Sequence, residues 1–221
     1  KMGEEKERVH IVGAPVLDTI LNEPLPTKIE LYSKLKLDLD KKFILLIQHP
    51  VSEDIKNAGL QMAMTIRAVK KSKLKVVVVY PHADAGGRQI IKEIQKEKNN
   101  KLFRIFKNVD HQTFLALERE AGVMVGNSSA GIIEAASFNT PVVNIGDRQK
   151  GRERSGNILD VSYSEKEIVA AINKSINDNK YLAKIRKIKN IWGDGKTGPR
   201  IVKILEELVI DVNLMAKQIS Y

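Results

Sequence analysis

Small residues and hydroxyls gather in residues 126–131, GNSSAG, directly after a short apolar run and before a helical pattern. Backbone N–H groups at a helix start have no partner within the helix and lie at the positive end of its dipole. With the hydroxyls of Ser128 and Ser129 they predict an anion site suited to phosphate. Glu134 follows about one helical turn later on the same side, where its carboxylate can accept hydrogen bonds from a sugar diol. The alternative is that Asn127 or Ser128 only caps the helix.

Two other loops follow predicted strands and contain histidine. His49 precedes Pro50 after the apolar run at residues 43–48. It could donate to a phosphate or exchange a proton near neutral pH, and a structural or capping role is the alternative. Residues 80–87, YPHADAGG, turn through small residues toward a helix. This turn either lets the backbone approach a ligand or is a plain connection.

A cationic segment, residues 146–154 with the sequence GDRQKGRER, follows the apolar run at residues 142–145. Its Lys and Arg side chains, close to the hydroxyl-rich segment, predict a phosphate clamp. Arg148 is the best placed because it comes directly after the strand and its turn. We interpret Arg152 and Arg154 as surface residues, which either pair with Glu153 or face solvent.

The elements that must position these residues alternate between short β-rich runs and longer helical segments. This pattern is typical of an α/β protein with a Rossmann-like parallel sheet and helices on both faces. Ligands of such sheets bind beyond the carboxyl ends of the strands, where the candidate residues fall. Strands are predicted at residues 43–48, 76–80, 102–106, 123–125, 142–145 and 158–161. Helices are predicted from Ser52 to about Val69 and over residues 86–98, 112–121, 131–138 and 165–177.

The two ends of the chain differ from this central region. Residues 1–22 open with a charged run and contain no strand, so we expect a connector from a missing N-terminal domain. Residues 23–197 are predicted to form a Rossmann-like nucleotide-binding domain. Over residues 198–221 an apolar stripe begins after Gly198-Pro199 and continues toward Ile219, which predicts a long helix that packs on the missing domain or on a partner chain.

Composition excludes several classes of protein. The 221 residues, 43% of them hydrophobic, suffice for a substantial core. The chain has no Cys, which excludes disulfides and thiolate chemistry, and its four His are scattered, so we expect no metal and no other cofactor. No apolar run approaches the roughly 18 residues of a membrane span and no signal peptide is visible, so we expect a cytoplasmic protein without a membrane partner.

The net charge of +10 raises the question of a polyanionic partner. Lysines cluster at residues 34–42, 70–75, 92–101 and 180–189, mostly on polar faces or at ends of predicted helices. Few aromatic residues stand among them to stack on bases. We therefore interpret the clusters as solvated helix surface and expect no nucleic-acid partner.

Four segments together resemble the UDP-N-acetylglucosamine 2-epimerase family: residues 49–51 (HPV), 81–86, 126–157 and 193–196 (GDGK). The resemblance extends from about Ile11 to about Leu208 and is closest to the hydrolysing branch, which makes N-acetylmannosamine or related sugars for sialic-type acids. It implies two Rossmann-like domains that face each other across a cleft, as in GT-B glycosyltransferases. The chain would be the carboxyl-terminal, UDP-binding half of such a protein, and the family also implies a homodimer.

The same resemblance implies roles for individual residues on the nucleotide. It places Ser128 and Ser129 on the UDP diphosphate, Glu134 on the ribose hydroxyls and Arg148 at the nucleotide. Val109 matches a residue beside the uracil.

The histidines match positions closer to the reaction. His49 matches a family histidine in the active-site cleft that contacts the phosphates and assists the departure of UDP, so it is the catalytic residue expected in this chain. His82 falls where relatives can carry Asn, which implies a nucleotide contact. An imidazole at that position can still donate one hydrogen bond.

In the family, the sugar loses UDP by elimination to a glycal, and water then adds with inversion at C2. Removal of the C2 proton needs a base, and the addition needs an acid on a defined face of the ring. The acidic residues that do this in relatives belong to the N-terminal domain, so the chain alone is expected to be inactive. The alternatives are a stand-alone UDP-binding module without turnover and a UDP-sugar glycosyltransferase domain.

Overall fold

The computed structural model describes residues 4–38 and 41–216. The chain divides into two units, one formed by Pro24–Ile191 and the other by residues 1–23 together with residues 192–221. The first unit contains every strand found in the described residues and every residue singled out above for ligand binding.

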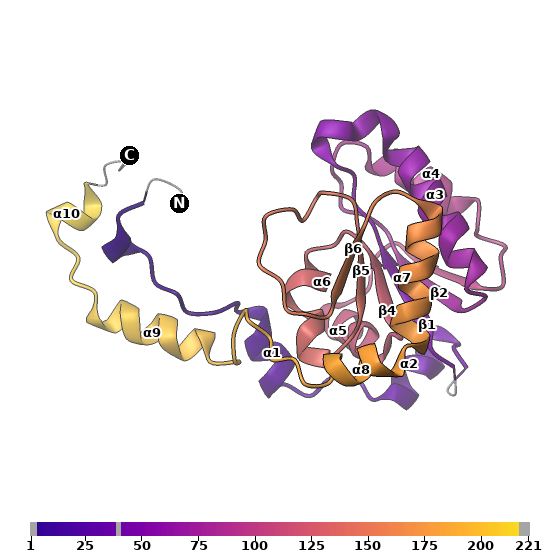
Figure 1. Ribbon diagram of the computed structural model, residues 1–221. Helices are drawn as coiled ribbons and strands as arrows, with labels where there is room; N and C mark the ends of the chain where they lie inside the picture. The colour runs from indigo at the N-terminus through magenta and orange to yellow at the C-terminus, as the bar shows by residue number, and fades with distance from the viewer. Residues whose placement is uncertain (1–3, 39–40, 217–221) are drawn as a thin grey trace. The chain divides into compact units, whose positions relative to one another are not determined.

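Six parallel strands form one sheet in the Pro24–Ile191 unit, in the order β3-β2-β1-β4-β5-β6 (Figure 1). The strands are β1 (Phe43–Ile47), β2 (Lys75–Val79), β3 (Phe103–Phe106), β4 (Val123–Gly126), β5 (Val142–Ile145) and β6 (Ile158–Val161). All six predicted strands are confirmed. The chain moves outward from β1 to β3 and then returns to pair β4 with β1, so the topological switch point lies between β1 and β4.

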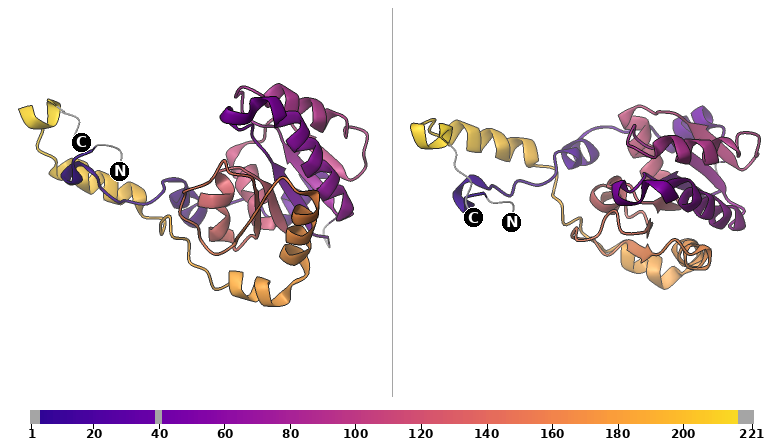
Figure 2. Two further views of the ribbon diagram at one scale, coloured as in Figure 1. Left: turned by 45° about the horizontal axis from the view of Figure 1, so that its top comes forward. Right: turned by 90° about the horizontal axis from the view of Figure 1, so that it is seen from above.

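Helices cover both faces of the sheet, which is why the central strand β1, with the sequence FILLI, is apolar and buried throughout. Ile44 and Leu46 of β1 pack in one core cluster with α3 (Ala58–Lys71), α4 (Gly87–Gln95) and α7 (Glu165–Asn177). On the other face, Leu45 packs in a second cluster with α2 (Lys28–Leu35) and α5 (His111–Glu120). Figure 2 shows the sheet between the two groups of helices. Burial of each such side chain contributes roughly 1.5–3 kcal/mol, so the two clusters fix the strand ends that carry the candidate residues.

The helices follow the predictions with two differences. The helix expected from Ser52 begins as a 3-10 turn, η2 (Ser52–Asn57), because Asp54 has non-helical backbone angles and α3 starts only at Ala58. The helix expected over residues 131–138 is split into α6 (Ala130–Ile133) and the 3-10 turn η3 (Ala135–Phe138). Glu134 stands at the break between the two. The helix that starts at the predicted anion site is therefore a single α-helical turn, and its dipole is smaller than that of the predicted longer helix.

Two helices of this unit were not predicted. Helix α2 begins with a complete capping box, in which Thr27 accepts from the backbone of Glu30 and Glu30 accepts from the backbone of Thr27. Helix α8 (Asn179–Ile185) is capped by Asp178, whose side chain accepts from the backbone of Tyr181 at 3.0 Å.

The second unit contains η1 (Lys6–Arg8), α1 (Val16–Asn22), α9 (Thr197–Glu207) and α10 (Val212–Met215). The carboxylate of Asp18 accepts hydrogen bonds from the backbone N–H groups of Thr197 and Gly198, at 2.9 and 2.6 Å, which lowers the pKa of Asp18 and caps the start of α9. The long helix predicted over residues 198–221 is shorter, since α9 ends at Glu207 and a non-helical segment separates it from α10. Residues 217–221 lie outside the described part of the chain.

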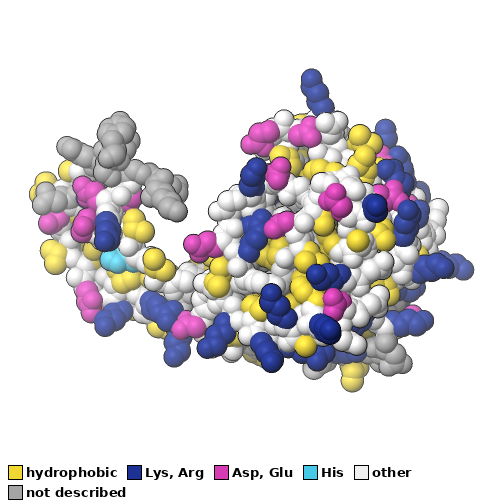
Figure 3. Space-filling view, in the orientation of Figure 1, with side chains coloured by type: hydrophobic (Ala, Val, Ile, Leu, Met, Phe, Trp, Pro, Cys, Tyr) yellow, Lys and Arg dark blue, Asp and Glu magenta, His cyan; other side chains and the backbone are white. Residues whose placement is uncertain are grey.

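Lys and Arg side chains are interleaved with Asp and Glu over the face drawn in Figure 3. Several lysines of the predicted clusters form exposed ion pairs, such as Lys70 with Glu97 and Lys71 with Glu165. Exposed pairs of this kind contribute about 0–1 kcal/mol each. Within residues 4–38 and 41–216, no helix is both long enough and apolar enough to cross a lipid bilayer.

Candidate functional site

The ends of β1 and β4 approach each other more closely than most side chains allow. Ile47 of β1 pairs with Gly126 of β4, and the backbone N–H of Asn127 donates to the Ile47 carbonyl at 3.1 Å. A Cβ atom at Gly126 would lie 1.9 Å from that carbonyl oxygen, and its φ of +129° is a glycine conformation. Glycine at this position therefore brings the loop after β4 against the loop after β1, at the switch point of the sheet.

Asn127 connects three loops through hydrogen bonds and is only 1% exposed. Its side chain accepts from the backbone N–H of His49 at 2.7 Å and donates to the His49 carbonyl at 2.9 Å. Its own carbonyl accepts from Arg148 Nη1 at 3.0 Å and from Gln149 Nε2 at 2.8 Å. Asn127 is therefore not a helix cap, which was one of the two alternatives for this motif. It fixes the loops after β1, β4 and β5 relative to one another.

The other capping alternative concerned Ser128. Its Oγ accepts from the backbone N–H of Ala130 at 3.3 Å, which is a local capping contact at the start of α6. Ser129 occupies the N-cap position, and its side chain makes no capping hydrogen bond. The Ser129 hydroxyl therefore differs from that of Ser128 in having no role in starting the helix.

His49 is buried and held in one orientation. Its Nδ1 accepts from the backbone N–H of His82 at 3.3 Å, and its ring stacks on the His82 ring with 4.7 Å between centroids. A neutral imidazole has one N–H, so this acceptor role places the proton on Nε2. Burial and the positive charge of Arg148 lower the pKa of His49 to about 4. In the ligand-free chain His49 is therefore a neutral donor, which favours the role of phosphate donor over proton exchange near neutral pH.

A polar cavity of about 590 Å³ opens beside this cluster. Ser129 and Arg148 both line it, together with acidic groups that include Asp84 and Asp147. Its remaining lining residues are Pro50, Val51, Ser52, Glu53, Gln149 and Arg152. Arg152, interpreted above as a surface residue, is exposed and also borders this cavity. The cavity thus combines the hydroxyls of Ser52 and Ser129 with two guanidinium groups, which are donors that bind phosphate oxygens well, and it also contains three carboxylates.

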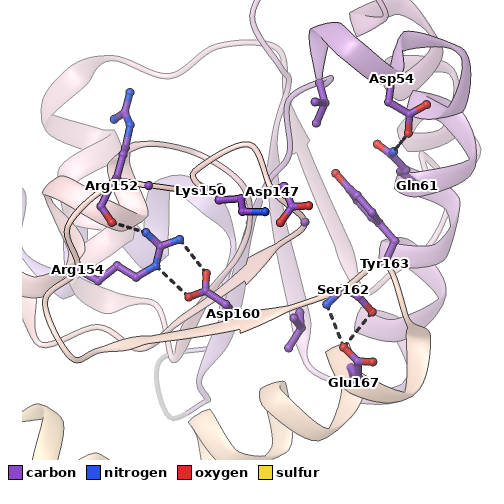
Figure 4. Close-up of a pocket in the computed structure, with 14 residues that line it drawn as sticks. Asp54, Gln61, Asp147, Lys150, Arg152, Arg154, Asp160, Ser162, Tyr163 and Glu167 are labelled. Carbon is purple, nitrogen blue, oxygen red and sulfur yellow. Dashed lines mark hydrogen bonds and ion pairs between the residues drawn. The ribbon is translucent and has the colours of Figure 1, made fainter. Parts of the chain in front are cut away.

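A second cavity, of about 680 Å³, borders the first and shares Val51, Asp147 and Arg152 with it (Figure 4). In Figure 4 Arg154 points toward Asp160, and its guanidinium donates to that carboxylate at 2.9 and 3.1 Å. It also donates to the carbonyl of Gln149 at 3.1 Å. The prediction for Arg154, pairing with Glu153 or exposure to solvent, is therefore wrong. Arg154 instead holds the loop after β5 against β6.

Of the candidate residues, only Ser129 and Arg148 line the 590 Å³ cavity. Ser128 points into the start of α6, as its capping contact shows. Val109 lies between β3 and α5 and packs on the second core cluster. Glu134 is partly buried at the α6–η3 break, where burial raises the pKa of its carboxyl group. The structure thus links His82 to His49, links His49 to Arg148 through Asn127, and places Arg148 and Ser129 on one cavity.

No metal site can be assigned within the described residues, since they contain no group of three or more His, Asp or Glu side chains placed to hold an ion. Positive charge at the cavity comes from Arg148 and Arg152 instead.

The sequence prediction missed the structural role of Asn127 and the buried Gln149. Both follow predicted strands, which is the one signal that could have drawn attention to them. Their hydrogen bonds join segments about 80 and 20 residues apart in the chain, and no local pattern reveals such pairings.

Comparison with known proteins places the chain in a family. The profile of the family described as UDP-N-acetylglucosamine 2-epimerase matches residues 1–206. The chain belongs to this family. A UDP-N,N'-diacetylbacillosamine 2-epimerase (hydrolyzing) from Legionella pneumophila is 36% identical over 221 residues, which are all of this chain and 57% of that relative. A UDP-N-acetylglucosamine 2-epimerase from Neisseria meningitidis is 32% identical over 183 residues, covering 83% of this chain and 48% of the relative. This family member thus spans about half the length of the curated relatives it matches.

Solved structures agree on the fold. The UDP-GlcNAc 2-epimerase from Neisseria meningitidis bound to UDP-GlcNAc superposes with a TM-score of 0.71 and 20% identity, over 93% of this chain and 57% of that one. The Methanocaldococcus jannaschii UDP-GlcNAc 2-epimerase in complex with UDP-GlcNAc and UDP gives a TM-score of 0.70 and 21% identity, over 93% and 56%. The fold of this epimerase-family chain is therefore the Rossmann-like domain of a GT-B-type protein.

Proposed function

We propose that this chain is the UDP-binding half of a hydrolysing UDP-sugar 2-epimerase. The substrate class is a UDP-linked 2-acetamido sugar, UDP-N-acetylglucosamine or its diacetamido relative UDP-N,N'-diacetylbacillosamine. The products are UDP and the free 2-epimer of the sugar. Family membership and the names of the relatives support this proposal.

The observation that carries the proposal is the junction of three loops at the switch point. Asn127 ties His49 to Arg148 there, and Arg148 shares a cavity with Ser129. A diphosphate in that cavity would receive hydrogen bonds from the Ser129 hydroxyl and the Arg148 guanidinium. Ligands of open α/β sheets bind in this place relative to the strands.

His49 would contribute as a neutral donor through Nε2–H. A diphosphate near the ring raises the pKa of the histidine, because a negative charge favours the imidazolium form. The charge that develops on UDP as the C1–O bond breaks has the same effect. We propose that His49 stabilises the departing diphosphate in this way, with its Nδ1 held by the backbone of His82.

The remaining assignments follow the family match. Glu134 would accept from the ribose hydroxyls, Val109 would contact the uracil, and Ser128 and His82 would lie along the nucleotide. In a protein of the relatives' length, the upstream half would supply the base and acid for the chemistry at C2, with residues 1–22 as the connector and residues 198–221 packing on that half. We further propose a homodimer without a bound cofactor.

The test is product analysis with the protein that contains this chain at its natural length. Incubation with UDP-N-acetylglucosamine in D2O is expected to give UDP and free N-acetylmannosamine with deuterium at C2, because elimination removes the C2 proton and solvent returns a deuteron. UDP-N-acetylmannosamine as the final product would contradict the hydrolysing assignment. Sugar transfer that needs an acceptor would favour a glycosyltransferase, and UDP binding without any turnover would favour a binding module.

A further inference from the structure

A buried carboxyl group lies beside the residue proposed to bind the ribose. Glu118, near the end of α5, has no exposed surface, and neither of its carboxyl oxygens has a hydrogen-bond donor among the described residues. An ionised carboxylate without donors is costly to bury, so a group in this position keeps its proton. A protonated carboxyl group has one O–H to donate.

The titratable side chain that acts on Glu118 is that of Glu134. Burial and the neighbouring Glu134 charge hold the pKa of Glu118 well above its ordinary value. Burial also raises the pKa of Glu134, while the hydrogen bond with Glu118 and the nearby His111 act in the opposite direction. Two ionised carboxylates cannot bond to each other, because neither has a proton to donate. The pair therefore holds one proton, which the fully buried Glu118 retains.

Thr140 links the two elements that carry this pair, α5 and the α6–η3 break. Thr140, which is 2% exposed, donates from Oγ1 to the carbonyl of Glu118 at 2.7 Å. The backbone N–H of Thr140 donates to the carbonyl of Ala135 at 3.0 Å, one residue after Glu134. Helix α5 and the α6–η3 break are thus held together by the same residue.

We propose that Glu118 is a positioning residue for nucleotide binding. Its O–H donates to one carboxyl oxygen of Glu134 and leaves the other oxygen oriented toward a ribose diol. The inference rests on the proposed function in one respect, which is the assignment of the diol to Glu134. Glu118 itself does not contact the nucleotide in this proposal. Its replacement weakens binding only through the contact between Glu134 and the ribose hydroxyls.

The first experiment is calorimetric titration of the chain with UDP and with 2',3'-dideoxy-UDP. We expect Glu118→Leu to lower the affinity for UDP by roughly tenfold, the scale of one hydrogen bond to a charged group, and to change the affinity for the dideoxy compound little. Glu118→Gln is expected to stay within about threefold of the parent for both ligands, because its amide N–H can replace the O–H.

The matched control is Ser175→Ala on α7, which removes another fully buried polar group without a hydrogen-bond partner. It is expected to change neither affinity. Equal losses for UDP and the dideoxy compound in Glu118→Leu would mean a merely structural role and would overturn the proposal. Unchanged UDP affinity in that variant would overturn it as well.

The second experiment needs no nucleotide. Carboxyl ¹³C NMR of the ligand-free chain at pH 6 is expected to show one glutamate side chain still protonated, with its signal absent in Glu118→Gln. Exposed glutamates are ionised at that pH. Absence of such a signal from the parent would contradict the shared proton. A parent chain with this signal that fails to bind UDP would instead contradict the proposed function and the diol role with it.

Discussion

Ser129 and Arg148 line the same cavity from different loops, so each can be tested separately. Ser129→Ala is expected to weaken UDP binding by about 1–3 kcal/mol, the usual cost of a lost hydrogen bond to a charged group. Isothermal titration calorimetry measures this, with Ser33→Ala on the exposed surface of α2 as the control. Equal UDP affinity in the parent and in Ser129→Ala would remove this hydroxyl from the site.

Arg148 is expected to matter at least as much as Ser129. Replacement by Ala removes the guanidinium that Asn127 orients, and the charge-assisted bonds to a diphosphate with it. The predicted result is a loss of at least about 1–3 kcal/mol for UDP and almost none for uridine, measured in the same titrations. Arg88→Ala, on the exposed surface of α4, serves as the matched loss of one positive charge. A similar loss in both variants would point to general electrostatic attraction instead.

His49 makes the stability of the chain depend on pH. Its pKa is about 4 in the folded chain against an ordinary value of 6.5, so between these values the unfolded state binds a proton that the folded state does not. The free energy of unfolding should therefore fall by about 2 kcal/mol from this residue between pH 7 and pH 5. Urea unfolding at both pH values measures it. His49→Gln keeps the backbone contacts to Asn127 and should lose this component, and an unchanged pH dependence would contradict the burial argument.

At the scale of elements, the close approach of β1 and β4 is the feature on which the site depends. Gly126→Ala places a methyl group 1.9 Å from the Ile47 carbonyl oxygen, so the strand ends must separate. We expect a loss of stability of about 3 kcal/mol or more, or failure to fold, together with loss of UDP binding. Thermal unfolding followed by titration measures both.

Gly151→Ala is the matched control for that change. Gly151 also has a positive φ, +80°, but a Cβ there meets nothing within 4 Å. Gly151→Ala should lower the free energy of unfolding only by the backbone strain, about 1–2 kcal/mol. If the two variants behave alike, conformational strain alone explains Gly126, and the close contact between the strands is not the cause.

The sequence predicted the centre of the sheet well because a strand buried on both faces, such as β1, is a continuous apolar run. Residues 142–145 and 158–161 are strands with the predicted ends. Helix α2 was missed although Thr27 and Glu30 form a capping box that a closer reading of the local pattern would have found. The split at Glu134 was not predictable in the same way, because Thr140 and its contact with α5 set the backbone there.

The candidate site was predictable only in its location. Residues after strand ends of a parallel sheet are the expected ligand contacts, and four of the predicted ones meet at the switch point. The neutral state of His49, the connecting role of Asn127 and the Glu118–Glu134 pair depend on burial and on contacts between distant segments. No spacing of residues along the chain contains that information.

At the scale of the whole molecule, every residue assigned to nucleotide binding lies in the Pro24–Ile191 unit. This unit has both core clusters and all six strands, so a fragment of residues 24–191 should fold cooperatively and bind UDP within about threefold of the full chain. Circular dichroism and calorimetry on the fragment test this. An unfolded fragment, or a folded one without affinity, would show that the flanking unit contributes to the site.

The proposed function requires that the switch point of this sheet holds the diphosphate of UDP. Calorimetric titration of the chain with UDP and with uridine tests it most directly, because the two ligands differ only in that diphosphate. We predict measurable binding of UDP, much weaker binding of uridine, and a smaller difference between the two ligands in Ser129→Ala and in Arg148→Ala. Equal affinities for UDP and uridine, or no binding by a chain shown to be folded, would mean that this switch point is not a diphosphate site.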